Sequence, residues 1–323
     1  MDASVIIPVY NVAPYIEDCL QSVMRQTYAG SMECLIVDDG GIDESIPIAE
    51  RMIAEYDGPI RFEIIHHKHN RGLSAARNTG MEKAVGDYIF FLDSDDEITE
   101  DCLERMMAVV REHPEVDLVQ GRHICYQDGK GSIAPKEIKI TNAKSNDEVR
   151  RCFNNHGQVI WQAWNKLMRR SIIKESHIAF YEGLLWEDAP WTFCWLKYVK
   201  NAWFLAEVTY RYKIRPGSVV TSTDINTKEV HRLKGYHKII THLTPGYETQ
   251  EIERVAPSFI RKFLHHSYHI PELKEDLKVY WHYAWGNRSY KLCAALAICY
   301  VVRRSKWLGR IVYSLAFGQN NLC

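Results

Sequence analysis

The 323-residue sequence contains no apolar run long enough to cross a lipid bilayer. Its longest run, Leu292–Val302, has 11 residues, whereas a transmembrane helix needs roughly 18 or more. The amino terminus, MDASVIIPVYN, also lacks the basic segment and the cleavage site of a secretory signal peptide. We therefore expect a cytoplasmic protein whose chain does not cross a membrane.

Cysteine pairs and an excess of charge of one sign are missing as well. The nine cysteines are scattered and form no CxxC pair, so neither a zinc site nor a disulfide framework is indicated. The 40 basic and 41 acidic residues leave a formal net charge of −1, which gives no reason to expect nucleic acid as a partner. With 46% hydrophobic and 25% charged residues, the composition is that of a globular protein with one large or two smaller domains.

The first 120 residues alternate between short apolar runs and helical patterns. Runs rich in Val, Ile and Leu predict strands at SVIIPV, ECLIVDD, RFEIIHH and DYIFFLD. Helical periodicity predicts helices at Pro14–Gln26, Ser45–Tyr56, Ser74–Ala84 and Thr99–Arg111, the last with Thr99 as its N-cap. This alternation indicates an α/β fold with helices flanking a mostly parallel sheet, and ligands of such sheets bind beyond the carboxyl ends of the strands.

The pattern loosens after about residue 121. GKGSIAPK predicts a turn, EIKIT predicts a strand, and the chain from Ser222 onward predicts helices almost throughout. We expect one domain over residues 1–220, with halves at 1–110 and 111–220, and a helical C-terminal region over residues 221–323.

Glycine is absent from the first turn, PVYNVAPY. A dinucleotide-binding Rossmann domain needs G-x-G-x-x-G there, so that its backbone can approach a pyrophosphate. Four carboxylates lie at the end of the fourth predicted strand or just after it, namely Asp93, Asp95, Asp96 and Glu97. They suit a divalent cation, because Mg²⁺ typically bridges one or two carboxylates to substrate phosphates. The alternative is a solvated acidic loop that leads into the next helix.

Three segments in order resemble the nucleotide-sugar domain of family-2 glycosyltransferases, which have the GT-A fold: SVIIPVYN, LIVDDGGIDES and NRGLSAARNTGMEKAVGDYIFFLDSDD. The resemblance covers residues 3–110, and WNKLMRRSII and LLWEDAPW resemble segments of bacterial members. It implies metal-dependent, inverting transfer of a sugar from a nucleotide diphosphate, with UDP favoured, to a hydroxyl of a glycan or lipid-linked acceptor. The Q-x-x-R-W motif of processive synthases is absent, which favours one transfer per encounter.

The resemblance also implies roles for the residues on the donor side. Pro8, Val9 and Tyr10 would pack against the base, although Tyr10 could instead be a core aromatic, and Asp39 would accept a hydrogen bond from the base imide. Arg71 and Arg77 would contact phosphate or organise the carboxylate loop; for Arg77 a structural salt bridge is an equal alternative.

The acidic cluster after the fourth predicted strand would bind the cation and the ribose. By the same resemblance, Asp93 would hydrogen-bond the ribose and Asp95 would ligate Mg²⁺ or Mn²⁺, with Ser94 between them as a further donor-binding residue. Asp93 and Asp96 would lie at the ion or just behind it.

The acceptor hydroxyl must lose its proton as it attacks, which calls for a general base. WEDAPW offers Asp188 as that base by resemblance, with Glu187 helping to position it. The competing interpretation is an acid pair at a helix start, favoured by the helix dipole.

The partners on the acceptor side remain open. SYKLCAALAICYVVRRSKWLGRIVYSLAFG combines apolar faces with basic residues and Trp307. This pattern suits an anionic membrane surface at the inner face of the cell membrane, and equally a homodimer interface or packing on the catalytic domain.

Two rival functions stay in view. A sugar-phosphate nucleotidyltransferase would need a glycine-rich triphosphate loop near residue 10, which is absent. The second alternative is a catalytically inactive nucleotide-sugar-binding or scaffolding protein of the same fold. Loss of the site carboxylates would indicate such a protein, but Asp39, Asp93, Asp95 and Asp188 are all present.

Overall fold

The computed structural model describes residues 1–215 apart from 128–129, 135–136 and 155–156, together with separate positions between 217 and 235. The chain divides into two compact units, one made of residues 1–183 and 187–218 and the other of residues 184–186 and 219–323. All the elements named below belong to the first unit. Of the region predicted to be helical from Ser222 onward, the described positions 227–228, 231–232 and 234–235 are helical, and the segment after residue 235 lies outside the described residues.

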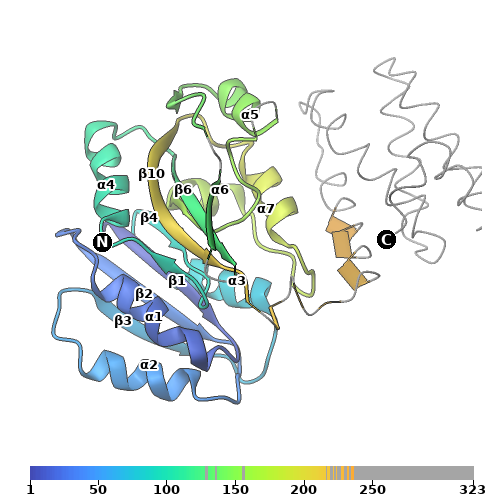
Figure 1. Cartoon of the computed structure of the whole chain (residues 1–323). Helices are drawn as coiled ribbons and strands as arrows, with labels where there is room; N and C mark the ends of the chain where they lie inside the picture. Colours follow the sequence, from blue (N-terminus) through green and yellow to red (C-terminus); the bar gives the residue numbers. More distant parts are fainter. Residues whose placement is uncertain are drawn as a thin grey trace, which may run out of the picture. The chain divides into compact units, whose positions relative to one another are not determined.

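A mixed β-sheet with helices on both faces forms the first unit (Figure 1). The strands are β1 (Ala3–Val9), β2 (Met32–Asp38), β3 (Arg61–His66), β4 (Tyr88–Phe91), β5 (Glu97–Ile98), β6 (Leu118–Gln127), β7 (Lys130–Ala134), β8 (Asn142–Ala143), β9 (Lys166–Arg169) and β10 (Ala202–Lys213). The helices are α1 (Ala13–Met24), α2 (Ser45–Ala54), α3 (Leu73–Lys83), α4 (Cys102–Glu112), α5 (Asn146–Asn154), α6 (Arg170–Ser176) and α7 (Asp188–Trp195).

The first half of the sheet is parallel, as the sequence predicts. Its strands lie in the order β3-β2-β1-β4, and every pairing among them is parallel. The carboxyl ends of these four strands therefore meet at one edge, which brings together the loops after Val9, Asp38, His66 and Phe91.

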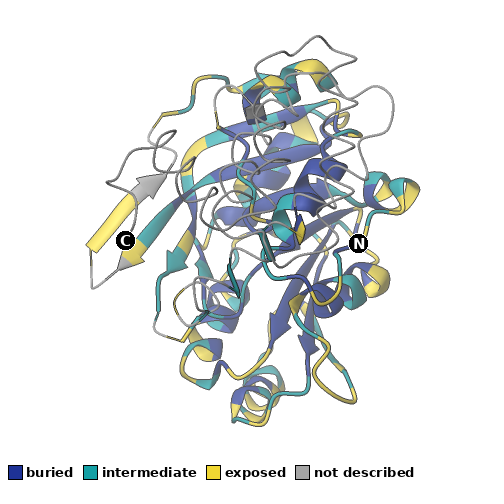
Figure 2. Cartoon of the chain, turned by 90° about the vertical axis from the view of Figure 1, so that its right-hand side faces the viewer, coloured by how far each residue is buried: buried dark blue, intermediate teal, exposed yellow. Residues whose placement is uncertain are grey.

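Alternate residues of β1 explain why helices cover both faces of the sheet. Val5 and Ile7 share a hydrophobic cluster with Leu20 of α1, whereas Ile6 points to the other face, where its Cγ2 would lie 2.3 Å from a Cβ added to Gly80 of α3. The glycine lets α3 lie directly on the strand. Figure 2 shows the resulting pattern, with buried strands through the centre and exposed positions on helices and loops.

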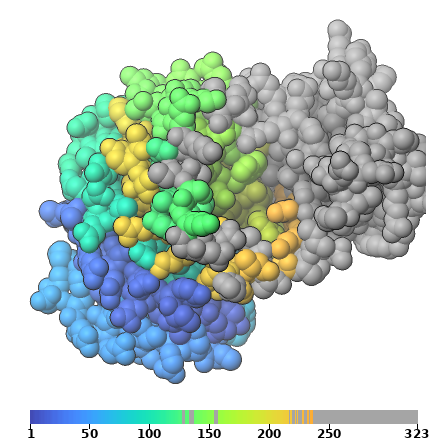
Figure 3. Space-filling model, viewed as in Figure 1, coloured from blue at the N-terminus to red at the C-terminus, as the bar shows by residue number. Residues whose placement is uncertain are grey.

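The second half of the sheet is mixed rather than parallel. Strand β9 pairs antiparallel with both β4 and β6, while β6 and β10 are parallel to each other. The two halves adjoin in the space-filling view, where the first half runs from blue to teal and the second from green to yellow (Figure 3).

Three local predictions are wrong. Helix α4 begins at Cys102 rather than Thr99, because β5 pairs with β10 and the Thr99 N–H continues that pairing by donating to Thr209 O. Residues 130–134 form strand β7 instead of a turn, since the chain folds back and pairs with β6. Residues 137–141, predicted as a strand, are irregular, and the short strand β8 follows them.

No helix in the described part of the chain is both long enough and apolar enough to cross a membrane.

Candidate active site

The loop after β1 gives the predicted base-binding residues different surroundings. Val9 is 1% exposed and belongs to the hydrophobic core, and Pro8 is buried in β1. Tyr10 is 48% exposed, so it is not a core aromatic. Of the three, Tyr10 is the side chain that can reach a ligand at this edge.

Asp39 holds together the loop that leads into α3. Its Oδ1 accepts hydrogen bonds from the Arg71 N–H at 2.9 Å and from His67 Nδ1 at 2.7 Å, and its Oδ2 accepts one from the Gly72 N–H at 2.7 Å. Gly72 has φ +90°, a conformation that a side chain would strain. Because Asp39 is only 2% exposed, its first role is to shape this loop, and its contact with a base stays a prediction.

The side chains of Arg71 and Arg77 have contrasting environments. Arg71 is 42% exposed and pairs with Glu182 at 3.0 Å. Arg77, on α3, is 1% exposed. Its guanidinium lies 5.3 Å from the ring centre of Phe180 and 5.9 Å from that of Phe91.

Arg77 joins three carboxylates from distant parts of the chain. Its Nη1 donates to Glu187 at 2.5 Å and to Asp188 at 2.7 Å, and its Nη2 donates to Asp93 at 2.7 Å. The planar guanidinium suits this forked arrangement, which an ammonium could not reproduce. The predicted general base Asp188 and its neighbour Glu187 therefore share one buried guanidinium with Asp93, the first residue of the predicted cation site.

Burial raises the pKa values of the acid pair at the start of α7, Glu187 and Asp188. Burial, reinforced by the charge of Asp188 and opposed by Arg77, raises the pKa of Glu187 to about 8. Burial also raises the pKa of Asp188, while Arg77 opposes the rise. A pKa of about 8 leaves Glu187 mostly protonated near neutral pH.

The remaining acidic residues after β4 differ in how far the protein engages them. Asp95 accepts a hydrogen bond from Arg215 Nε at 2.6 Å. Both oxygens of Asp96 are engaged, one by the Tyr210 hydroxyl and one by the Lys213 N–H, each at 2.8 Å. At 1% exposed, Asp96 fits the position just behind an ion rather than contact with it.

Asp93 and Asp95 offer the carboxylate oxygens with which a divalent cation can bridge a protein to a diphosphate. Burial and the charge of Asp93 raise the pKa of Asp95, which means that negative charge is crowded here. In the described part of the chain, each of the two carboxylates is bound by a side chain at one oxygen only, through Arg77 and Arg215. The described residues hold no group of three or more potential metal ligands. Two carboxylates fit Mg²⁺ or Mn²⁺ carried with a diphosphate, not a cation held by the protein alone.

Sequence patterns missed several residues of this site. Tyr210 and Lys213 come from β10, over 110 residues after Asp96, and Lys166 of β9 lies 0% exposed near Asp188. A fully buried lysine is rare unless it is paired, but the sequence gives no sign of its burial. Lys166 ends the WNK triplet of a segment that resembles bacterial family members, and this resemblance is the one signal in the sequence that could have drawn attention to it.

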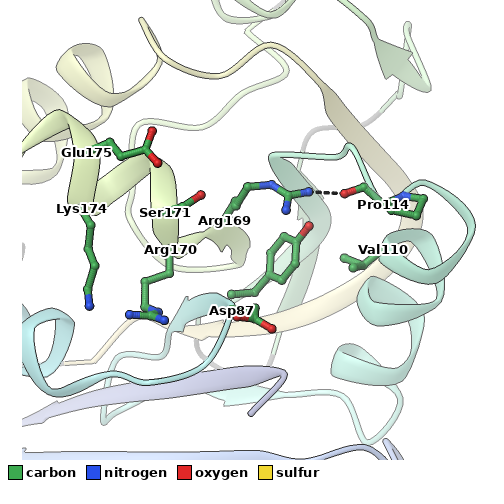
Figure 4. A pocket seen from close by; sticks show the side chains of 9 residues that line it. Asp87, Val110, Pro114, Arg169, Arg170, Ser171, Lys174 and Glu175 are labelled. Atoms are coloured by element: carbon green, nitrogen blue, oxygen red, sulfur yellow. Dashed lines mark hydrogen bonds between the residues drawn. The ribbon is translucent and has the colours of Figure 1, made fainter.

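A cavity of about 570 Å³ lies elsewhere in the first unit, and none of the predicted site residues lines it (Figure 4). Asp87, just before β4, and Tyr88, its first residue, contribute to it, whereas Asp93 follows the opposite end of that strand. From α6, Arg170 and Lys174 point the same way, while Arg169 bonds Pro114 O (Figure 4). This cavity is separate from the candidate active site.

Comparison with known proteins identifies the family. A model of the family described as "Glycosyl transferase family 2" matches residues 4–176, more than half of the chain. The chain belongs to glycosyltransferase family 2. This membership confirms the predictions of a glycosyltransferase and of transfer that depends on a nucleotide sugar.

Relatives of this glycosyltransferase include two proteins of Bacillus subtilis. The putative glycosyltransferase EpsH is 35% identical over 222 residues, which are 67% of this chain and 62% of EpsH. The uncharacterized glycosyltransferase EpsJ is 30% identical over 236 residues, which are 72% of this chain and 67% of EpsJ. The chain thus matches about two thirds of the length of these relatives.

Among solved structures, S. aureus TarS 1-349 in complex with UDP-GlcNAc is similar to this glycosyltransferase with a TM-score of 0.74 at 20% identity. The similarity covers 99% of this chain and 93% of that chain. It confirms the GT-A type α/β fold.

Proposed function

We propose that this glycosyltransferase moves a sugar from a UDP-linked donor to a hydroxyl of a glycan or lipid-linked acceptor, non-processively and with inversion. The observation that carries the proposal is the buried cluster in which Arg77 binds Asp93, Glu187 and Asp188. It brings carboxylates suited to the donor side and to the acceptor side within reach of one guanidinium. Similarity to TarS, whose structure holds UDP-GlcNAc, supports the choice of UDP.

The donor would lie at the carboxyl edge of β1, β2 and β4. Exposed Tyr10 would pack against the base, and Asp39 would fix the loop beside it. Asp93 and Asp95 would hold a divalent cation, Mg²⁺ or Mn²⁺, which when bound neutralises the diphosphate charge. Ser94, between them and 6% exposed, would contribute through its backbone.

Asp188 would act as the general base. It takes the proton of the acceptor hydroxyl while that oxygen bonds to the anomeric carbon, and the electron pair of the breaking bond leaves with the diphosphate. Its raised pKa strengthens its basicity, and the Arg77 contact favours its ionised form. Glu187, protonated near neutral pH, would hold Arg77 in place without competing for the proton.

The acceptor and the location of the reaction are part of the same proposal. A lipid-linked acceptor would bring this cytoplasmic enzyme to the inner face of the cell membrane. The amphipathic segment predicted to bind there, or to form a dimer, lies outside the described residues.

A donor screen tests this function. UDP-, dTDP- and GDP-sugars are incubated with the protein, with and without Mn²⁺, and nucleotide release is measured with water as acceptor. We expect Mn²⁺-dependent release from UDP-sugars, a loss of about 10²–10⁴-fold in Asp188→Asn, and no change in the exposed control Asp57→Asn. Binding of UDP without release, in every donor and metal combination, would indicate the inactive binding protein instead.

A further inference from the structure

Lys166 is a buried basic residue that has no role in the reaction proposed above. It opens β9, which lies between β4 and β6 in the centre of the sheet. The residue is 0% exposed, and its Nζ donates to Gln162 O. Within the described part of the chain, Lys166 forms no direct ion pair with a carboxylate. Burial lowers the pKa of Lys166 to about 7, while the charge of Asp188 opposes the fall, and a lysine at so costly a place needs a reason.

A short stretch of chain links Lys166 to the predicted base. Gln162 accepts from Lys166, and the next residue, Ala163, donates its backbone N–H to the Asp188 carboxylate. Fixing Gln162 O therefore fixes the direction of the Ala163 N–H. Lys166 and Asp188 lie on the two sides of one peptide segment.

The charges around Asp188 also favour a cation here. Arg77 on α3, Asp93 after β4 and Glu187 before α7 face Asp188, and Lys166 reaches it from β9. The charge of Asp188 favours the protonated form of Lys166, whose pKa burial and the charge of Arg77 bring down to about 7. His123 of β6 does not compete as a cation, since burial and the charge of Lys166 lower the pKa of His123 to about 4.

We propose that Lys166 is a positioning residue for Asp188: it anchors the Gln162–Ala163 peptide so that the Ala163 N–H stays on the Asp188 carboxylate, and its charge stabilises the anionic form of that base. This inference rests on the proposed role of Asp188. It assigns Lys166 no contact with donor or acceptor.

A purely structural lysine would behave differently from a positioning residue. If Lys166 only supported the sheet, its loss would lower stability and donor binding together. Because it acts through Asp188, its loss should lower turnover alone, and only while Asp188 is present.

A double-mutant cycle separates these cases. Turnover is measured as UDP release from the UDP-sugar that the wild-type protein hydrolyses fastest, and UDP affinity by calorimetry. We expect Lys166→Met to lower kcat by about 10²-fold, as for a catalytic group displaced by ~1 Å, with donor KM and UDP affinity unchanged. Lys166→Arg, which keeps the charge, should recover part of the loss.

The decisive measurement is the double variant. Asp188→Asn with Lys166→Met should be no slower than Asp188→Asn alone, since Lys166 then has no base to position. The exposed Lys174→Met on α6 serves as the matched control and should behave as the wild type. If Lys166→Met does not fold, Lys166→Arg and Lys166→Gln provide the same comparison of charge kept and charge lost.

The outcomes distinguish the inference from the function on which it rests. Multiplicative losses in the double variant, or unchanged kcat in Lys166→Met, would overturn the role of Lys166 while leaving Asp188 as the base. Unchanged turnover in Asp188→Asn would overturn the proposed base itself, and the role of Lys166 with it.

Discussion

Protonation of Glu187 in the folded protein predicts that its replacement by Gln stabilises the fold near neutral pH. Glu187 is 4% exposed, and burial raises its pKa from 4.5 to about 8. Between these values the unfolded chain releases the proton and the folded protein keeps it. Since the folded state then binds more protons, stability is fully present below about pH 4.5 and falls as pH rises toward 8.

The size of the effect follows from the same shift. Each pKa unit corresponds to about 1.4 kcal/mol, and the interval from 4.5 to 7 is 2.5 units, so retaining the proton costs the folded state about 3–4 kcal/mol at pH 7. A Gln side chain has no proton to lose, and its amide oxygen can still accept from Arg77 Nη1. We expect Glu187→Gln to gain about 1–3 kcal/mol at pH 7 and nothing at pH 4.5.

Urea unfolding at half-unit steps from pH 4.5 to 8.5 measures this difference. The exposed Glu50→Gln on α2 is the matched control and should keep the wild-type pH dependence. Equal slopes for wild type and Glu187→Gln would mean that Glu187 is ionised in the folded protein, and the protonation argument would be refuted.

Three further predictions concern the donor, the metal and the membrane. Calorimetry should show UDP binding more tightly with Mn²⁺ or Mg²⁺ in the wild type, and equally with and without metal in Asp95→Ala; a metal effect that survives in the variant would contradict the cation site. Asp39→Asn should raise the donor KM and lower the melting temperature, since weakened bonds to the Arg71 and Gly72 N–H groups cost ~1.5–3 kcal/mol; an unchanged KM would remove Asp39 from donor binding. The full chain should sediment with anionic vesicles at low salt and release at high salt; if neutral vesicles bind it equally, the basic C-terminal segment is not the cause.

The sequence predicts the parallel half of the fold well, because its strands are nearly continuous apolar runs that only a sheet covered on both faces can bury. Val5, Ile6 and Ile7 are all 0% exposed. The carboxyl edge followed from this half, since the loops that carry Asp39 and Asp93 both come after parallel strands.

The partners of the site residues could not be predicted in the same way. Arg77 meets Glu187 and Asp188 across about 110 residues of chain, and no local periodicity encodes that contact. The start of α4 was wrong for a related reason: Thr99 is a good N-cap residue, but its N–H is drawn into the pairing with β10. In each case a long-range partner outweighed a local preference.

Unfavourable local features gather around the same cluster, and this supports its function. Asn165, next to Lys166, has φ +58°, and the buried Nε of Arg77 and Nε1 of Trp191 have no hydrogen-bond partner in the described residues. Glu187 keeps a proton that an exposed glutamate would lose, and Lys166 is buried with no carboxylate paired to it among the described residues. Selection for stability alone would remove such features, whereas active sites retain them. Lys166→Met and Glu187→Gln should therefore share one signature, a melting temperature that is unchanged or higher together with slower turnover; a variant that is both less stable and fully active would show that its residue serves the fold instead.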